Sequence, residues 1–118
     1  MLRLVLLAFT IAAASANFYI CESGSEQFLG HYTMDTSKTD GAPKFSNDEG
    51  MSVYRHSGYW YIGDLGPWPP ETHYRCIQGC EHGMDSPQLD KVYEQNRNIG
   101  QLPAPTLQAD PCAVNDEL

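Results

Sequence analysis

The sequence predicts a mainly β protein: a small antiparallel sheet of five to six strands in a meander of hairpins, stapled by disulfides and followed by a short C-terminal helix and an extended tail. Between residues 17 and 82, aromatic and β-branched runs alternate with turn-forming segments, and apolar residues repeat with a period of two. After residue 83, one apolar stripe at helical spacing and then several prolines predict the helix and the tail. We therefore divide the chain into residues 1–16, 17–82 and 83–118.

Residues 1–16 have the composition of a signal peptide. Arg3 supplies a cationic start, an apolar run extends from residue 4 to residue 13, and Ala14-Ser15-Ala16 gives the small-residue cleavage pattern. The run is shorter than the roughly 20 residues needed to cross a bilayer, and no later segment approaches that length. We expect a cleaved leader and no membrane span.

Six short segments are predicted to be strands. In the second of them, Phe28, Tyr32 and Met34 fall on one side with a period of two. Pro43 places the third segment at a sheet edge, because proline cannot donate to a ladder. Polar residues predict a loop at 36–41 and a turn at 47–50. The six segments are residues 18–21, 28–35, 43–46, 52–56, 59–64 and 72–77.

The strongest local signal is a hairpin centred on Ser57-Gly58, a two-residue turn between two aromatic strands. Its register brings Arg55 opposite Trp60, close enough for the guanidinium to stack on the indole. One face of the hairpin then carries Arg55, Trp60, Val53 and Ile62, and the other carries Tyr54, Tyr61, His56 and Tyr59. Large aromatic rings supply much of the buried area in a domain of this size. The residues assigned to the core are Phe28, Tyr32, Phe45, Val53, Trp60 and Ile62.

The region after residue 83 is predicted to begin with a helix. Ser86-Pro87 combines a capping residue with proline at the first helical position, and Leu89, Val92 and Tyr93 form one apolar stripe. Gly100 follows the expected end of the helix. Residues 101–111 contain three prolines and are expected to be an extended tail.

Four cysteines, Cys21, Cys76, Cys80 and Cys112, are expected to form two disulfides in an oxidising lumen. Of the three possible pairings we favour Cys21–Cys76 with Cys80–Cys112, because the first could join neighbouring strands and the second would hold the tail. Two other interpretations use Cys76 and Cys80 differently. One is a thiol-redox pair, although the spacing is one residue longer than C-x-x-C. The other is a zinc site of His73, Cys76, Cys80 and His82.

Several spaced motifs accompany the predicted strands: Gly30-x-Tyr32, then Gly41-x-Pro43-x-Phe45, and then Tyr54 and Arg55 followed by Gly58, Trp60 and Ile62. This arrangement, over about residues 28–64, resembles small aromatic-rich β modules in secreted proteins of unicellular eukaryotes. The resemblance implies a small β fold but no particular activity.

Charge and motifs favour binding over catalysis. The formal net charge is −8, which argues against nucleic acid as a partner. The chain has no nucleophile elbow, no H-E-x-x-H and no phosphate-binding glycine loop, so we expect neither an independent enzyme nor a cofactor. We expect a soluble binding or accessory module whose aromatic surface contacts a peptide, a protein or a glycan. The candidate binding residues are Tyr54, Tyr59, Tyr61 and Trp68.

The last four residues, Asn115, Asp116, Glu117 and Leu118, resemble the KDEL-type signals that a receptor reads to return soluble proteins to the endoplasmic reticulum. Asn115 stands where such signals usually have a cation. Together with the leader, this end predicts residence in the lumen of the endoplasmic reticulum and binding to the retrieval receptor, with secretion as the alternative.

Overall fold

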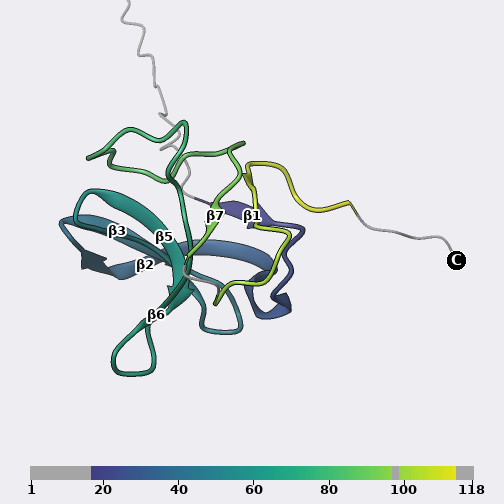
Figure 1. Cartoon of the computed structure of the whole chain (residues 1–118), viewed down its shortest axis with the longest axis horizontal. Helices are drawn as coiled ribbons and strands as arrows, with labels where there is room; N and C mark the ends of the chain where they lie inside the picture. The colour runs from purple at the N-terminus through teal and green to yellow at the C-terminus, as the bar shows by residue number, and fades with distance from the viewer. Residues whose placement is uncertain (1–16, 97–98, 114–118) are drawn as a thin grey trace, which may run out of the picture.

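The computed structural model describes residues 17–96 and 99–113 (Figure 1). The predicted leader at 1–16 and the retrieval-like residues at 115–118 lie outside the described residues. Within the described ranges, no helix is long and apolar enough to cross a membrane. The strands are β1 (Phe18–Ile20), β2 (Gly30–Thr39), β3 (Ala42–Ser46), β4 (Ser52–His56), β5 (Tyr59–Asp64), β6 (Glu71–Arg75), β7 (Glu94–Gln95) and β8 (Leu107–Gln108), with a short 3-10 helix, η1 (Glu26–Phe28), between β1 and β2.

The eight strands form one antiparallel sheet in the order β7-β6-β5-β4-β3-β2-β1-β8. Figure 1 shows the sheet curled into a half-barrel. β1 to β6 follow one another as a meander, whereas β8 returns to the far edge and pairs with β1. The segments that precede the two edge strands, β7 and β8, contact each other. Val92 forms a β-bridge with Thr106, and the N–H of Tyr93 donates to the carbonyl of Pro105 at 3.1 Å. The predicted antiparallel β class is confirmed, and the strand count is higher because β7 and β8 lie in the region predicted as helix and tail.

The predicted hairpin is confirmed as β4 and β5, with the same bounds and the same register: His56 opposite Tyr59, Arg55 opposite Trp60, Tyr54 opposite Tyr61 and Val53 opposite Ile62. Ser57 and Gly58 have φ angles of 52° and 84°, as a tight hairpin turn with the twist of the flanking strands requires. β2 differs from the prediction, since it continues through the expected loop to Thr39. A register shift between Met34 and Lys38 lets this polar segment keep pairing with β3.

A second irregularity lies between β5 and β6. Ile62 is opposite Tyr74, whereas Gly63 is opposite Thr72, so His73 is an extra residue in β6. Gly63 has no room for a Cβ atom, because the carbonyl oxygen of Glu71 lies against it. The bulge brings Arg75 opposite Tyr61. This register decides which side chains of β6 share the outer face of the sheet.

The core fills the inner face of the half-barrel. The indole of Trp60, only 1% exposed, lies 6.2 Å from the ring of Phe45, and its Nε1–H donates to the carbonyl of Met84 at 3.0 Å. The Tyr32 hydroxyl donates to the Phe28 carbonyl at 2.7 Å, so a polar atom inside the core is satisfied. All six residues assigned to the core from the sequence are buried, a confirmed prediction, and they are joined by Phe18, Ile20, Tyr74, Tyr93 and Leu107.

The predicted C-terminal helix is wrong. No α-helix occurs in the described residues, and the segment instead contains bends, the Val92 bridge and β7. Of the predicted stripe, Tyr93 is fully buried, but Val92 is 61% exposed. A helix this short is marginal in water, and the extended segment gains hydrogen bonds to the tail, including Asp90 N–H to the carbonyl of Leu107 at 2.7 Å.

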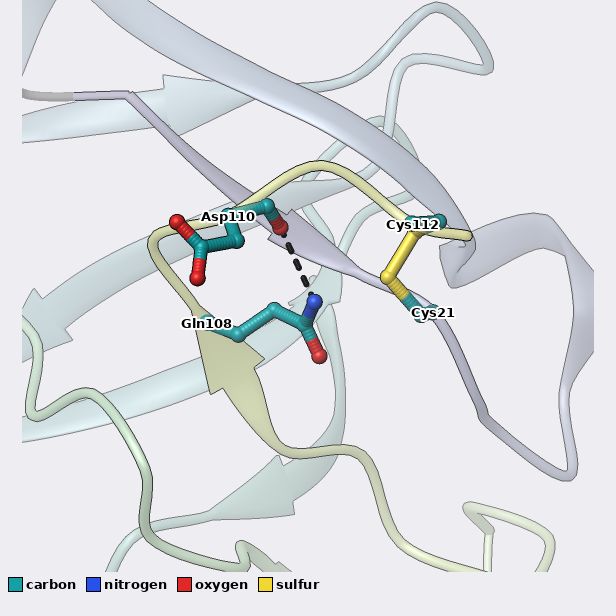
Figure 2. Close-up of a disulfide and its surroundings, with 4 residues drawn as sticks. All are labelled: Cys21, Gln108, Asp110 and Cys112. Carbon is teal, nitrogen blue, oxygen red and sulfur yellow. Dashed lines mark hydrogen bonds between the residues drawn. A yellow bond between two sulfur atoms is a disulfide. The ribbon is translucent and has the colours of Figure 1, made fainter. Parts of the chain in front are cut away.

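The favoured disulfide pairing is also wrong: the bridges are Cys21–Cys112 and Cys76–Cys80. The pairing of β1 with β8 explains the first, because it places the residue after β1 beside the chain that follows β8 (Figure 2). In the same figure the side-chain amide of Gln108 donates to the carbonyl of Asp110 at 2.9 Å, which turns the tail toward Cys21. The tail is therefore fixed to the first strand and not to the Cys80 loop.

Candidate functional site

A groove of about 890 Å³ lies on the outer face of β4, β5 and β6. These strands form its floor, the loop that joins β5 to β6 forms one wall, and Asn96 and Ile99 border it as well. In Figure 1 this loop extends well beyond the body of the sheet, next to the label of β6. A concavity of this size, lined by aromatic rings and a few polar groups, is typical of ligand-binding sites.

Three residues cross the floor of the groove in a row, one from each strand. Tyr54 lies opposite Tyr61, and Tyr61 lies opposite Arg75. The two tyrosine rings are stacked, with centroids 5.8 Å apart and an interplanar angle of 18°. The Tyr54 hydroxyl donates to the Thr72 hydroxyl at 3.3 Å, and burial raises the pKa of Tyr54 above its ordinary value. Tyr54, only 6% exposed, is thus a fixed part of the floor that supports the ring of Tyr61.

Trp68 lies on the wall of the groove and is 89% exposed. Pro67, Pro69 and Pro70 flank it, and their fixed φ angles limit the conformations of the loop. The loop is also anchored at its start, where the N–H of Gly66 donates to the Asp64 carboxylate at 2.9 Å. An indole this exposed on a stiff loop stabilises the fold little, so its side chain is available to a ligand.

Tyr59, the fourth candidate, supports the groove from beside it. Its ring lies 4.8 Å from the ring of His82, and the guanidinium carbon of Arg75 lies 4.5 Å from its centroid. The same guanidinium lies 5.6 Å from the centroid of Tyr61. Of the four predicted residues, Tyr54, Tyr61 and Trp68 line the groove, and Tyr59 positions Arg75.

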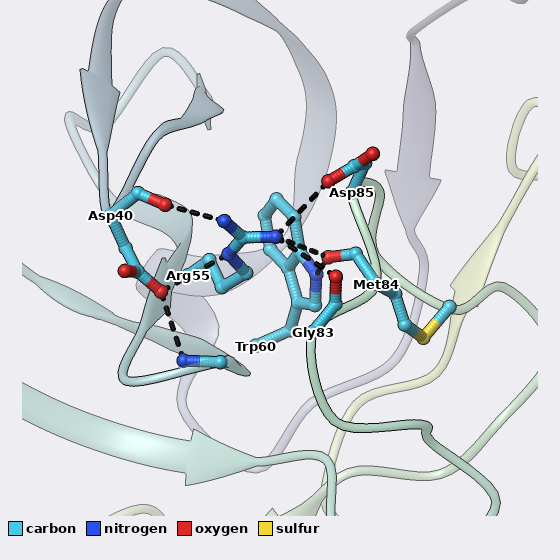
Figure 3. A network of polar contacts seen from close by, with 7 residues as sticks. Asp40, Arg55, Trp60, Gly83, Met84 and Asp85 are labelled. Carbon is cyan, nitrogen blue, oxygen red and sulfur yellow. Dashed lines mark hydrogen bonds and ion pairs between the residues drawn. The ribbon is translucent and has the colours of Figure 1, made fainter.

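Arg55 closes one end of the groove through a polar network (Figure 3). Its Nε lies 3.1 Å from Oδ2 of Asp40, and its Nη1 donates to the carbonyl of Met84 at 2.9 Å and contacts the Asp85 carboxylate at 3.2 Å. Arg55 and Trp60 thus meet at the same carbonyl of Met84, and the predicted stacking of Arg55 on Trp60 is not found, since the cation–π contacts of the described residues are made by Arg75. The network ties residues 83–85 to the strands.

Asp40 holds the neighbouring hairpin in the same network. Its Oδ2 also accepts the backbone N–H of Gly58 at 2.9 Å. This hydrogen bond and the Arg55 guanidinium hold the pKa of Asp40 below its ordinary value. The carboxylate therefore stays charged and paired, and it is already engaged before any ligand arrives.

The residues of the zinc interpretation are placed apart from this groove. Cys76 and Cys80 are joined to each other, so neither offers a thiolate. His73 is buried with its ring 4.8 Å from that of Phe28, whereas His82 is exposed beside Tyr59. In residues 17–96 and 99–113, no group of three or more histidine, cysteine or acidic residues is arranged to hold a metal ion.

Arg75 is the residue that the sequence prediction missed. Without the bulge at His73, Tyr61 would lie opposite Tyr74, and Arg75 would have no place in the aromatic row. Asn96 was missed because the region containing it was expected to be helical. Its side chain instead donates to the carbonyl of Thr72 at 3.0 Å and covers the edge of β6 beside the groove.

Comparisons with protein-family models, with characterised proteins and with solved structures find no match for this chain.

Proposed function

We propose that the protein is a non-enzymatic binding module that holds a peptide or a glycan in the aromatic groove. The observation that carries the proposal is the exposed Trp68 beside the stacked pair Tyr54–Tyr61. An exposed ring held on a stiff loop loses little conformational entropy on binding, and tryptophan and tyrosine dominate binding energy at interfaces. The groove offers mainly aromatic contact surface, and one of its carboxylates, Asp40, is already engaged by Arg55 and Gly58.

Trp68→Ala tests this role. We expect the variant to lose about tenfold or more in affinity for any peptide or glycan ligand that binds the native protein, because the substitution removes the most exposed ring of the groove. Its thermal midpoint should stay close to that of the native protein. Binding would be measured on peptide and glycan arrays and then by calorimetry, on protein with both disulfides intact.

Leu102→Ala is the matched control, since Leu102 is 64% exposed and does not line the groove. It should leave binding unchanged. Ligands held equally well by the native protein and by Trp68→Ala, or the lack of any ligand on both arrays, would contradict the proposed role.

The proposed location is the lumen of the endoplasmic reticulum, supported by the leader-like residues 1–16 and by the sequence of residues 115–118. Deleting the last four residues is expected to move most of the protein from the cell to the medium, because the retrieval receptor would lose its contact. Immunoblots of cells and medium would measure this. Replacing the same four residues with Lys-Asp-Glu-Leu is the positive control. An unchanged distribution after the deletion would favour the alternative, secretion.

A further inference from the structure

Arg75 differs from the other arginine of the groove in forming no ion pair with a described residue. The guanidinium of Arg55 pairs with Asp40 and Asp85, whereas that of Arg75 is held by contacts to two tyrosine rings. The Nε atom of Arg75 is buried. A guanidinium carries five donors, and at least the Nε–H of Arg75 has no acceptor among the described residues.

Two aromatic contacts hold this guanidinium in place. Its central carbon lies 4.5 Å from the ring centroid of Tyr59 and 5.6 Å from that of Tyr61. Cation–π contacts fix the position of the cation but leave its donors free. Arg75 is therefore pre-positioned to receive an acceptor, and carboxylates match the guanidinium best because they accept two parallel hydrogen bonds.

Other charges in the groove do not neutralise Arg75. Asp40 is engaged by Arg55 and Gly58. Glu71 also lines the groove, but the bulge leaves it three ladder positions from Arg75, about 10 Å along the strand. That distance exceeds the Debye length of about 8 Å at physiological ionic strength. Glu94 lies opposite Arg75 on β7, but no ion pair joins the two side chains, and Glu94 does not line the groove. His56, whose ring centroid is 6.3 Å from that of Tyr61, carries no negative charge. The Arg75 end of the groove thus favours an anionic group.

The groove recognises its ligand with side-chain faces and not with backbone. β4 and β5 are interior strands, and the outer edge of β6 is occupied by β7 at Tyr74 and Arg75 and by Asn96, which donates to the carbonyls of Thr72 and His73, so little free strand edge is offered to an extended peptide. The groove presents flat rings, a guanidinium and the side chain of Asn96. Sugar rings stack their C–H faces on aromatic planes and exchange hydrogen bonds with planar polar groups, which matches this set.

We infer that the ligand is a glycan that bears a carboxylate, as uronic and sialic sugars do. Its ring stacks on the aromatic side chains of the groove while its carboxylate is bound by Arg75. This inference rests on the proposed function, and it adds the chemical class of the ligand and the residue that selects it.

The test compares sialyllactose, a hyaluronan oligosaccharide and an oligogalacturonate with the carboxyl-reduced form of each, by calorimetry on the disulfide-bonded protein. At least one acidic oligosaccharide is expected to bind about tenfold to a hundredfold more tightly than its reduced form, which is the range for a charge-assisted pair. High salt should weaken that binding and leave the reduced form unaffected. Arg75→Gln should abolish the preference, and Arg75→Lys should keep part of it, because the charge remains but the bidentate geometry is lost.

Lys44→Gln is the matched control, since Lys44 pairs with Asp35 at 3.5 Å outside the groove, and it should leave the preference intact. Thermal melts would establish that each variant is folded. Equal affinity for the acidic and reduced forms, no binding of any of the three acids, or tighter binding of a glutamate-rich peptide would overturn the inference. A neutral glycan or a peptide whose binding depends on Trp68 would still support the proposed function, whereas ligands insensitive to Trp68→Ala would contradict both.

Discussion

Replacing Cys21 and Cys112 with alanine is expected to lower the free energy of unfolding by about 4–5 kcal/mol. The bridge spans 91 residues of sequence, and the chain-entropy contribution of a disulfide grows with the length of the loop that it closes. The bridge also attaches the tail, which contains β8, to the residue that follows β1. Its loss therefore frees one edge of the half-barrel. The total free energy of unfolding of a small domain is only about 5–15 kcal/mol. This variant should therefore melt at least roughly 15 °C below the native protein. Calorimetry or circular dichroism would measure the shift.

The second bridge supplies the control. Cys76–Cys80 spans 4 residues, for which the same entropy argument gives about 2 kcal/mol. The Cys76→Ala/Cys80→Ala variant should therefore melt between the native protein and the other double variant. The reverse order would mean that the tail is not held to β1 as the structure describes.

The parts of the fold that local chemistry specifies were predictable from the sequence. The β4–β5 hairpin follows from a two-residue turn whose residues accept positive φ angles, and the turn alone sets the register. The buried face follows from that register, because side chains alternate along each strand. The alternation predicts Trp60 in the core, and the prolines that flank Trp68 predict that this residue lies in a surface loop.

The parts that depend on distant segments were not predictable. The closure of the half-barrel uses backbone hydrogen bonds of Asp90 and Tyr93 to the tail, and backbone groups leave no pattern in the sequence. The disulfide pairing follows from that closure, since only a tail paired with β1 reaches Cys21. The helical spacing of Leu89, Val92 and Tyr93 was misleading because a short apolar stripe also fits an extended segment that buries a single ring.

Only part of the candidate site was predictable from the sequence. The outer tyrosines and the proline-flanked Trp68 carry strong compositional signals, and the structure places three of the four residues along one groove. Arg75 carries no such signal, because its position depends on one extra residue, His73, in the next strand. A one-residue change of register exchanges the two faces of a strand. The selectivity that we infer for the site therefore depends on a bulge that the sequence pattern does not predict.

Trp60→Ala is expected to lower the free energy of unfolding by about 3–5 kcal/mol, which would unfold much of the protein at 37 °C. The substitution empties the volume of the largest fully buried side chain, between Phe45 and the inner face of the sheet. It also removes the Nε1–H donor that anchors the carbonyl of Met84, so the loop that contacts Arg55 loses one of its ties. Chemical denaturation followed by tyrosine fluorescence would measure the loss.

Two variants separate the packing of Trp60 from its hydrogen bond and from general effects of losing an indole. Trp60→Phe keeps an aromatic ring without the N–H donor. It should lower the free energy of unfolding less than Trp60→Ala does, because the phenyl ring retains part of the packing. Trp68→Ala makes the same substitution at a position 89% exposed and should hardly change stability. Equal losses at positions 60 and 68 would contradict the division of the aromatic residues into a core face and a binding face. A large loss of stability at position 60 alone would support that division, because only the inner ring is packed in the core.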